Sequence, residues 1–268
     1  MENKELTLKE FIALAVKVLE KAPYLKQRKV ITDFFKNSKD KYARLAIVDT
    51  FYSTQMNKRL FGLDDLAKEI EEIGTDEQLK EEVEKFKNYD DEQNKISKLL
   101  SDKNKYGIRK NGKDFGHARS LISKYIYFAT DFNFPIEDTF VKDNINIILL
   151  HFVKNEIDNK NDILKEIIKF CDGNKIKYSE FDNLLWLFGK IKKGSLSLIV
   201  KKEEYLDIIK GLGLKSKNYK KSEEFNKSEE FNKCMACKLK NLQEIEKIKD
   251  LISDDFYTFL VQSSNIDI

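Results

Sequence analysis

The chain has 268 residues, of which 41% are apolar and 35% are charged, and this composition excludes a disordered protein. The net charge of +3 is too small to indicate a nucleic-acid partner by itself. Three cysteines are too few for a disulfide framework, and no apolar run is long enough for a signal peptide or a membrane span. We therefore expect a cytoplasmic protein of one large domain or two lobes.

Scarcity of proline and glycine favours long helices. Only two prolines and ten glycines occur, which leaves few turn signals for strands. Apolar residues at helical spacing predict helices over residues 6–21, 29–35, 43–51, 63–73 and 75–100. Thr7 and Glu10 have the spacing of a capping box at the start of the first helix. We expect the helix over 43–51 to be buried and the charged face of 75–100 to be solvated.

Small polar side chains directly follow the apolar 43–51 helix. Residues 52–59 read Y-S-T-Q-M-N-K-R. Hydroxyl and amide groups together can read the donors and acceptors of a base edge, but they can equally cap the end of a helix. The candidate substrate-binding residues in this stretch are Tyr52, Ser53, Gln55 and Asn57.

Positive charge is concentrated between residues 103 and 124. This stretch contains seven Lys or Arg residues and one acid, Asp114. It leads into an apolar helix over 116–129, then Pro135, and then the adjacent carboxylates Glu137 and Asp138. A carboxylate beside a basic loop suits a polyanionic substrate in a reaction that develops positive charge. The alternative is a surface loop, a packed helix and an aspartate that caps the next helix.

The second half of the chain is also predicted to be helical. The expected helices cover residues 145–157, 163–171, 180–190, 203–212 and 242–260, with a short extended piece at 194–202. Trp186 is either a stacking residue for a base or a core residue. The tandem S-E-E-F-N-K within 221–233 is interpreted as an insertion. Cys234 and Cys237 have zinc-knuckle spacing but lack two further ligands, so we expect no metal site.

Three blocks in this order resemble the helix-hairpin-helix DNA glycosylases, the superfamily of endonuclease III and 8-oxoguanine DNA glycosylase. Residues 43–57 resemble the buried helix and polar motif of that family, and 116–129 resemble the helix after its hairpin. The sequence P-I-E-D-T-F-V at 135–141 is similar to the family's P-x-V-D-T-H-V, whose aspartate is the catalytic carboxylate. Asp138 is the matching residue. The blocks cover roughly the first half of the chain.

The sequence also departs from the family pattern. The family's hairpin reads G-x-G, whereas Gly112 and Gly116 stand four residues apart. Members that also cleave the backbone carry a lysine at the start of the post-hairpin helix, whereas Lys124 lies inside that helix, 14 residues before Asp138. The four cysteines of the family's iron–sulfur cluster are missing. The resemblance therefore implies a glycosylase without a lyase step and without a cofactor.

The resemblance implies an all-α fold with two helical lobes and a cleft between them. The first lobe would comprise residues 41–138, and the second would comprise 1–40 together with 139–268. The protein is expected to be a monomer.

The resemblance further implies a monofunctional DNA N-glycosylase that removes a damaged or modified base, in repair or in defence against phage DNA. Asp138 would stabilise the cationic sugar, Lys124 is a second catalytic candidate, and Trp186 could wall the pocket for the flipped base. The expected contacts with double-stranded DNA are Lys105, Arg109, Lys110, Lys113, His117 and Arg119.

Two other functional classes remain open at this point. One is a helical nucleic-acid-binding protein without catalytic activity. The other is a nuclease, in which Glu137, Asp138 and Asp143 would start a metal-binding cluster.

Overall fold

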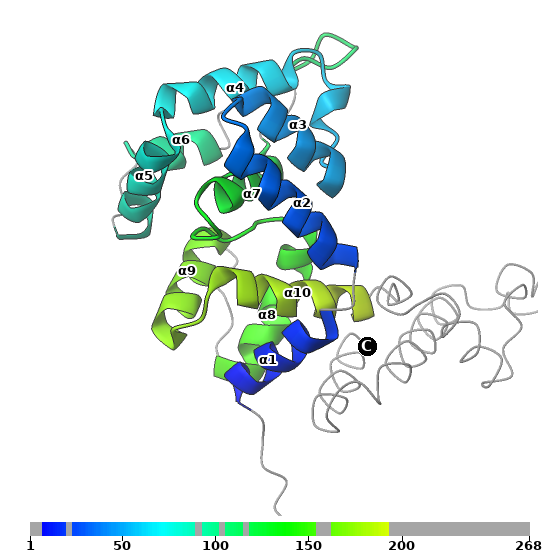
Figure 1. Cartoon of the computed structure of the whole chain (residues 1–268), viewed down its shortest axis with the longest axis vertical. Coiled ribbons are helices and arrows are strands. Elements are labelled where there is room, and N and C mark those ends of the chain that lie inside the picture. The colour runs from blue at the N-terminus through cyan, green and yellow to red at the C-terminus, as the bar shows by residue number, and fades with distance from the viewer. Residues whose placement is uncertain are drawn as a thin grey trace, which may run out of the picture. The chain divides into compact units, whose positions relative to one another are not determined.

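The computed structural model describes residues 7–19, 23–88, 93–101, 105–114, 118–153 and 162–192. The fold of these residues is all-α, as predicted, with isolated β-bridges and no strands among them (Figure 1). None of the helices in these ranges combines the length and the apolar character that crossing a membrane requires. The predicted elements after residue 192, the tandem repeat and the Cys234–Cys237 pair lie outside the described residues.

The order of the helices follows the apolar pattern of the sequence. The elements are α1 (Leu8–Leu19), α2 (Pro23–Asn37), α3 (Lys41–Tyr52), the 3-10 turn η1 (Met56–Lys58), α4 (Gly62–Ile73), α5 (Asp76–Asn88), α6 (Lys95–Leu100), α7 (Arg119–Ala129), α8 (Thr139–Val153), α9 (Ile163–Asn174) and α10 (Tyr178–Lys192). The capping box before α1 is confirmed. The Thr7 amide donates to Glu10 Oε2 at 2.7 Å, and the Glu10 amide donates to Thr7 Oγ1 at 3.4 Å.

The single helix expected over residues 75–100 is wrong, because α5 ends before α6 begins. Asn94 starts α6, and its Oδ1 accepts hydrogen bonds from the amides of Ile96 and Ser97 at 2.8 and 3.1 Å. Its Nδ2 donates to the carbonyl of Glu82 at 3.0 Å. The same buried side chain therefore caps α6 and ties it to α5.

The chain divides into two compact units. The larger lies within Lys26–Lys142 and Glu156–Asp182, and the smaller within Met1–Leu25, Asp143–Asn155 and Asn183–Ile268. The lobes expected from sequence were 41–138, and 1–40 with 139–268. Most of α2 and all of α9 belong to the larger unit, together with the segment expected for the first lobe.

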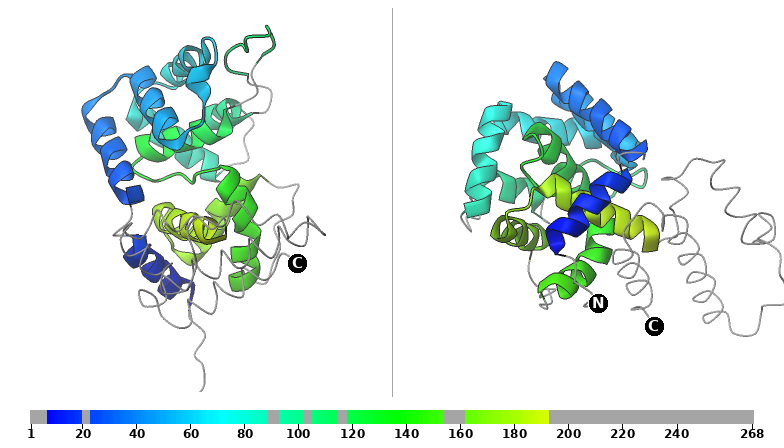
Figure 2. Two further views of the ribbon diagram at one scale, coloured as in Figure 1. Left: turned by 90° about the vertical axis from the view of Figure 1, so that its right-hand side faces the viewer. Right: turned by 60° about the horizontal axis from the view of Figure 1, so that its bottom comes forward.

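Helix α7 forms the core of the larger unit, where α3, α5 and α6 pack against it (Figures 1 and 2). All of its residues from Leu121 to Ala129 are buried. The ring of Phe35, from α2, lies 5.4 Å from the ring of Tyr125 and 5.7 Å from that of Phe128. These aromatic contacts explain why α2 packs in the same unit as α7.

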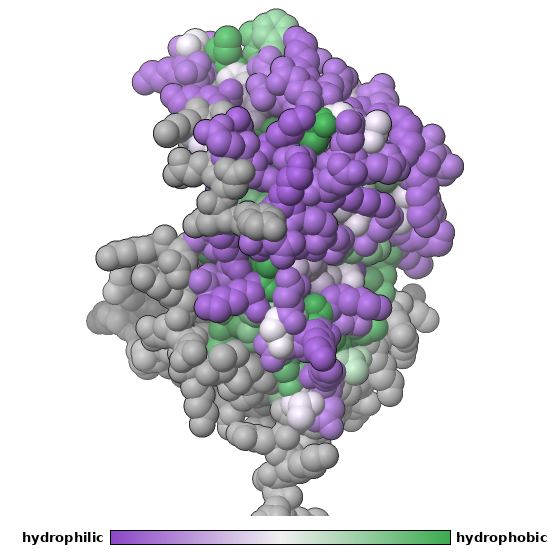
Figure 3. Space-filling model, turned by 90° about the vertical axis from the view of Figure 1, so that its left-hand side faces the viewer, coloured by the Kyte–Doolittle hydropathy of each residue, from purple (hydrophilic) through white to green (hydrophobic). Residues whose placement is uncertain are grey.

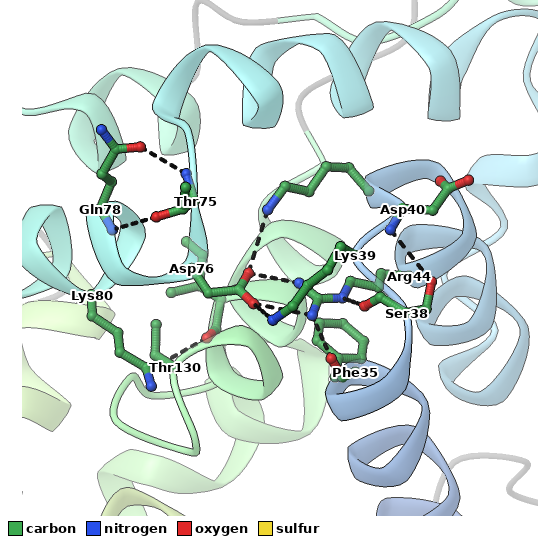
Figure 4. A network of polar contacts seen from close by, with 12 residues as sticks. Phe35, Ser38, Lys39, Asp40, Arg44, Thr75, Asp76, Gln78, Lys80 and Thr130 are labelled. Carbon is green, nitrogen blue, oxygen red and sulfur yellow. Dashed lines mark hydrogen bonds and ion pairs between the residues drawn. The ribbon is translucent and has the colours of Figure 1, made fainter.

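A buried arginine joins α2, α3 and α5. The side chain of Arg44 is 1% exposed, and its Nη1 donates to Asp76 Oδ1 at 2.7 Å while its Nε donates to the Ser38 carbonyl at 2.6 Å. Figure 4 shows Arg44 and Lys39 converging on Asp76. Burial alone would raise the pKa of Asp76, but the hydrogen bonds from Arg44 and Lys39 and the charges of Arg44 and Lys41 hold that pKa well below its usual value.

Many other charged residues, among them most Glu and Lys of α4 and α5, lie on the surface. Among the residues that Figure 3 colours by hydropathy, most of those on this face are hydrophilic, with apolar residues in small groups between them. Helices α4 and α5 alternate buried apolar residues with exposed Glu and Lys, as the amphipathic pattern predicts.

Candidate functional site

Polar side chains of α7 hold the segment of residues 135–138 in place. Arg119, Ser120, Ser123 and Lys124 share one side of the helix, because residues three and four apart lie over successive turns. Ser123 Oγ accepts a hydrogen bond from the amide of Glu137 at 3.0 Å, which fixes the backbone of the segment. Asp138 is thereby held beside α7.

Lys124, Asp138 and Tyr52 come together in the larger unit. Lys124 Nζ lies 2.9 Å from Asp138 Oδ2, donates to Ser120 Oγ at 2.8 Å, and lies 5.0 Å from the centre of the Tyr52 ring. The side chain of Lys124 is 3% exposed and that of Asp138 is 24% exposed. The structure thus groups the two candidate catalytic residues with one candidate substrate-binding residue, around a carboxylate that solvent can reach.

Asp138 also caps α8. Its Oδ1 accepts a hydrogen bond from the amide of Val141 at 3.0 Å, so the capping alternative from the sequence is confirmed as a contact. Oδ1 accepts the hydrogen bond that caps α8, and Oδ2 pairs with Lys124. Each carboxylate oxygen has two lone pairs, so these bonds leave acceptor capacity for a further ligand.

The neighbouring carboxylate, Glu137, is in a different environment. Its buried side chain receives a two-pronged contact from Arg119, with Nε–Oε2 and Nη2–Oε2 distances of 2.9 and 2.7 Å. Lys142 Nζ lies 2.8 Å from its Oε1. Burial raises the pKa of Glu137, but the hydrogen bonds and charges of Arg119 and Lys142 outweigh it, so the net shift is downward. Glu137 is an internal anchor for the segment.

Arg119 is engaged within the protein. Besides Glu137, its Nη1 donates to the Leu100 carbonyl at 2.7 Å and its Nη2 pairs with Asp162 Oδ1 at 3.0 Å. Burial lowers the pKa of Arg119, but Glu137 and Asp162 raise it, and the net shift is upward. The expected DNA contact of Arg119 stays a prediction. Its guanidinium already binds Glu137, Leu100 and Asp162, so it is less suited to DNA than the exposed cations of the chain.

The polar loop after α3 is shaped by Asp49. This buried carboxylate accepts hydrogen bonds from the amides of Met56 and Asn57 at 2.8 and 2.9 Å and from the Thr54 hydroxyl. The side chains of three candidate substrate-binding residues on this loop are exposed: Ser53, Gln55 and Asn57. Sequence reasoning missed Asp49, although an aspartate inside the apolar 43–51 helix was a signal that something nearby needed an acceptor.

The basic residues before α7 form a hairpin, which we call the basic hairpin (residues 105–114). The amide of Arg109 donates to the Lys113 carbonyl at 2.8 Å, and Gly112 closes the turn with a φ of 74°, a conformation that glycine adopts without strain. Lys105, Arg109, Lys110 and Lys113 are all exposed, and Lys105 lies 3.6 Å from Asp114. The hairpin projects from the helices in Figures 1 and 2.

The remaining candidates lie elsewhere. His117 is outside the described residues. Trp186 belongs to the smaller unit, where its ring stacks on that of Tyr24 with 4.3 Å between the centres. The sequence allows Trp186 to be either a stacking residue for a base or a core residue, and this contact is a packing contact within the protein.

Neither a metal site in the described residues nor a match to a known protein helps to assign the function. Within the described ranges, no group of three His, Cys, Asp or Glu side chains is placed to hold a metal ion. Comparisons with protein-family models, with curated proteins and with solved structures find no match to this chain. Its function is therefore inferred from its residues and their geometry.

Proposed function

We propose that this protein is a monofunctional DNA N-glycosylase that removes a damaged or modified base from double-stranded DNA and leaves an abasic site. The observation that carries the proposal is the position of Asp138. Its carboxylate is partly accessible, is fixed by Lys124 and the start of α8, and lies in the same cluster as the Tyr52 ring. A held carboxylate with remaining acceptor capacity suits a reaction whose transition state carries positive charge.

The proposed reaction is a hydrolysis. The bond between C1′ and the base nitrogen breaks, and its electron pair leaves with the base, which takes a proton from solvent. The sugar then resembles an oxocarbenium ion, which Asp138 stabilises. A water molecule adds its oxygen to C1′ and loses one proton to Asp138 or to solvent.

Lys124 supports Asp138 in this proposal and forms no covalent bond. Its Nζ is occupied by Asp138 Oδ2 and Ser120 Oγ. The nucleophile is water, so no Schiff base with the sugar forms.

The exposed residues of the larger unit would bind the DNA. Arg109, Lys110 and Lys113 at the tip of the basic hairpin are suited to phosphates, since they are solvent-exposed cations. Ser53, Gln55 and Asn57 are polar and exposed on the loop after Tyr52, as groups that read a base edge must be. We propose a cytoplasmic monomer that acts in repair or in defence against phage DNA.

The proposal is tested by base release. Duplex DNAs that each carry a different base modification are incubated with the protein, and free bases are identified by mass spectrometry while abasic sites are detected by alkaline strand cleavage. We expect release of one class of base, and no DNA adduct after borohydride treatment. A borohydride adduct that disappears in Lys124→Ala would contradict the monofunctional assignment.

A second candidate is a DNA-binding protein without catalytic activity. The hydrogen bond from Val141 to Asp138 favours it, because capping α8 is by itself a complete structural role for this residue. DNA binding without base release from any substrate would support this candidate over the glycosylase. The nuclease has less support, since Arg119 and Lys142 already pair with the Glu137 carboxylate.

A further inference from the structure

Among the large apolar side chains that are exposed on the larger unit, three are brought together by the backbone. Leu60, Phe61 and Ile108 are 56%, 58% and 40% exposed, and we call them the apolar patch. The amide of Leu60 donates to the Ile108 carbonyl at 3.1 Å, and the amide of Ile108 donates to the Leu60 carbonyl at 2.9 Å. Residues far apart in the sequence are therefore held side by side, with Phe61 adjacent to the pair.

Phe61 occupies its position at an energetic cost. Its φ of 59° lies in the left-handed region, which is uncommon for a bulky residue. Phe61 is also the N-cap of α4 and makes no side-chain capping bond, where Ser, Asp or Asn would stabilise the helix. An exposed aromatic side chain at a strained position is a sign of function, because neither burial nor backbone preference accounts for it.

Positive charge borders the apolar patch. Arg109 follows Ile108 directly and begins the tip of the basic hairpin, and Lys58 lies two residues before Leu60. Lys58 is also exposed. The acids nearby are Asp114, which lies near Lys105, and Asp64 and Asp65 in the first turn of α4, where Asp65 accepts a hydrogen bond from the Gly107 amide at 3.0 Å. A partner of this surface must therefore offer both apolar area and negative charge.

We propose that the apolar patch and the basic hairpin together bind DNA at a site where base stacking is interrupted. Phosphates contact the cations of the hairpin, and unstacked bases contact Phe61 and its apolar neighbours. In an intact duplex the faces of the bases are covered by stacking, so apolar side chains gain contact only where a step is opened. This inference rests on the proposed function, which identifies DNA as the partner. It adds the form of DNA that the protein prefers.

The test compares the affinity of the full-length protein for a paired duplex and for the same duplex with a short unpaired bubble, by fluorescence anisotropy. We expect tighter binding to the bubble. Phe61→Asn should weaken binding to the bubble by about tenfold and leave binding to the paired duplex unchanged. Because Asn tolerates the left-handed region, this variant should also melt at a higher temperature than the wild type.

Tyr42→Gln is the matched control, since Tyr42 is an exposed aromatic residue on α3 outside the apolar patch. It should keep the preference for the bubble. Equal wild-type affinity for both DNAs, a preference retained by Phe61→Asn, or binding to anionic phospholipid vesicles in place of DNA would each overturn the inference. Failure of the proposed function has a different signature, namely loss of the bubble preference in Phe61→Asn with no base released from any substrate.

Discussion

At the scale of single residues, two adjacent carboxylates have different roles. Glu137 is buried and bound by Arg119 and Lys142, whereas Asp138 is partly accessible and paired with Lys124. Both follow Pro135 and both are held by the same face of α7. Because their partners differ, Glu137 anchors the segment, whereas Asp138 is available to a ligand.

Glu137→Gln should destabilise the protein by about 3 kcal/mol, since it leaves the partly buried guanidinium of Arg119 without its main counter-charge. The free energy of unfolding is measured by urea denaturation. Lys142→Gln is the control: this lysine is 49% exposed, so its loss should cost less than about 1 kcal/mol. Equal losses from the two substitutions would contradict the anchoring role of Glu137.

Asp49→Asn should loosen the loop after α3. The substitution replaces a charged acceptor of three hydrogen bonds, and we expect a loss of about 2 kcal/mol of stability. Hydrogen exchange at the amides of Met56 and Asn57 should become faster, because these amides donate to Asp49. Thr54→Val removes only the hydroxyl donor and should leave the exchange of both amides nearly unchanged. Unaltered exchange in Asp49→Asn would show that the loop is held by other contacts.

At the scale of helices and segments, the sequence predicted a contact within one helical turn but not a contact between helices. The capping box of Thr7 and Glu10 spans one turn, so the sequence alone predicts it. The break before α6 depends on a contact between Asn94 and Glu82, 12 residues apart, which helical periodicity does not reveal.

In the candidate site, too, the sequence indicated residues but not the contacts between them. Asp138, Lys124 and Tyr52 were identified by residue type and resemblance, but their meeting depends on how α7 packs beside α3 and the 135–138 segment. The roles of Arg119 and Asp49 as internal partners, and the pairing of Leu60 with Ile108, arise only in the folded chain.

Because ion pairs join its helices, the protein should have a lower free energy of unfolding at acidic pH. The pKa values of Asp76 and Glu137 are lowered in the folded state, so their contribution to stability is fully present above their unfolded pKa values and is lost as pH falls through the folded ones. We expect the free energy of unfolding to drop below about pH 4.5. Asp76→Asn should reduce the size of this drop more than Asp33→Asn does, because the pKa of Asp33 is lowered by Lys29 in an exposed pair that solvent screens. An unchanged acid dependence in Asp76→Asn would contradict the role of the Arg44–Asp76 network.

At the scale of the whole molecule, the candidate catalytic cluster, the basic hairpin and the apolar patch all belong to the larger unit. The net charge of +3 is small, so any attraction to DNA depends on where the exposed cations are placed. DNA affinity should therefore depend on the basic hairpin more than on total charge.

Lys110→Ala combined with Lys113→Ala should weaken DNA binding and make its dependence on salt shallower, by roughly one unit for each phosphate that the protein no longer binds. The measurement is the slope of log affinity against log salt concentration. The matched control is Lys29→Ala with Lys68→Ala, which removes the same charge from exposed positions on α2 and α4. If the two double variants change the slope equally, the hairpin has no specific role in binding phosphates.

The most direct test of the proposed function is the rate of base release by Asp138→Asn on the substrate that the wild-type protein cleaves. Asparagine keeps the size of the side chain and its ability to cap α8, and it removes the charge. We predict a rate lower by about two to four orders of magnitude, with DNA binding retained, because electrostatic stabilisation of the sugar cation is lost. Wild-type rates in Asp138→Asn would contradict the assignment of Asp138 as the catalytic carboxylate.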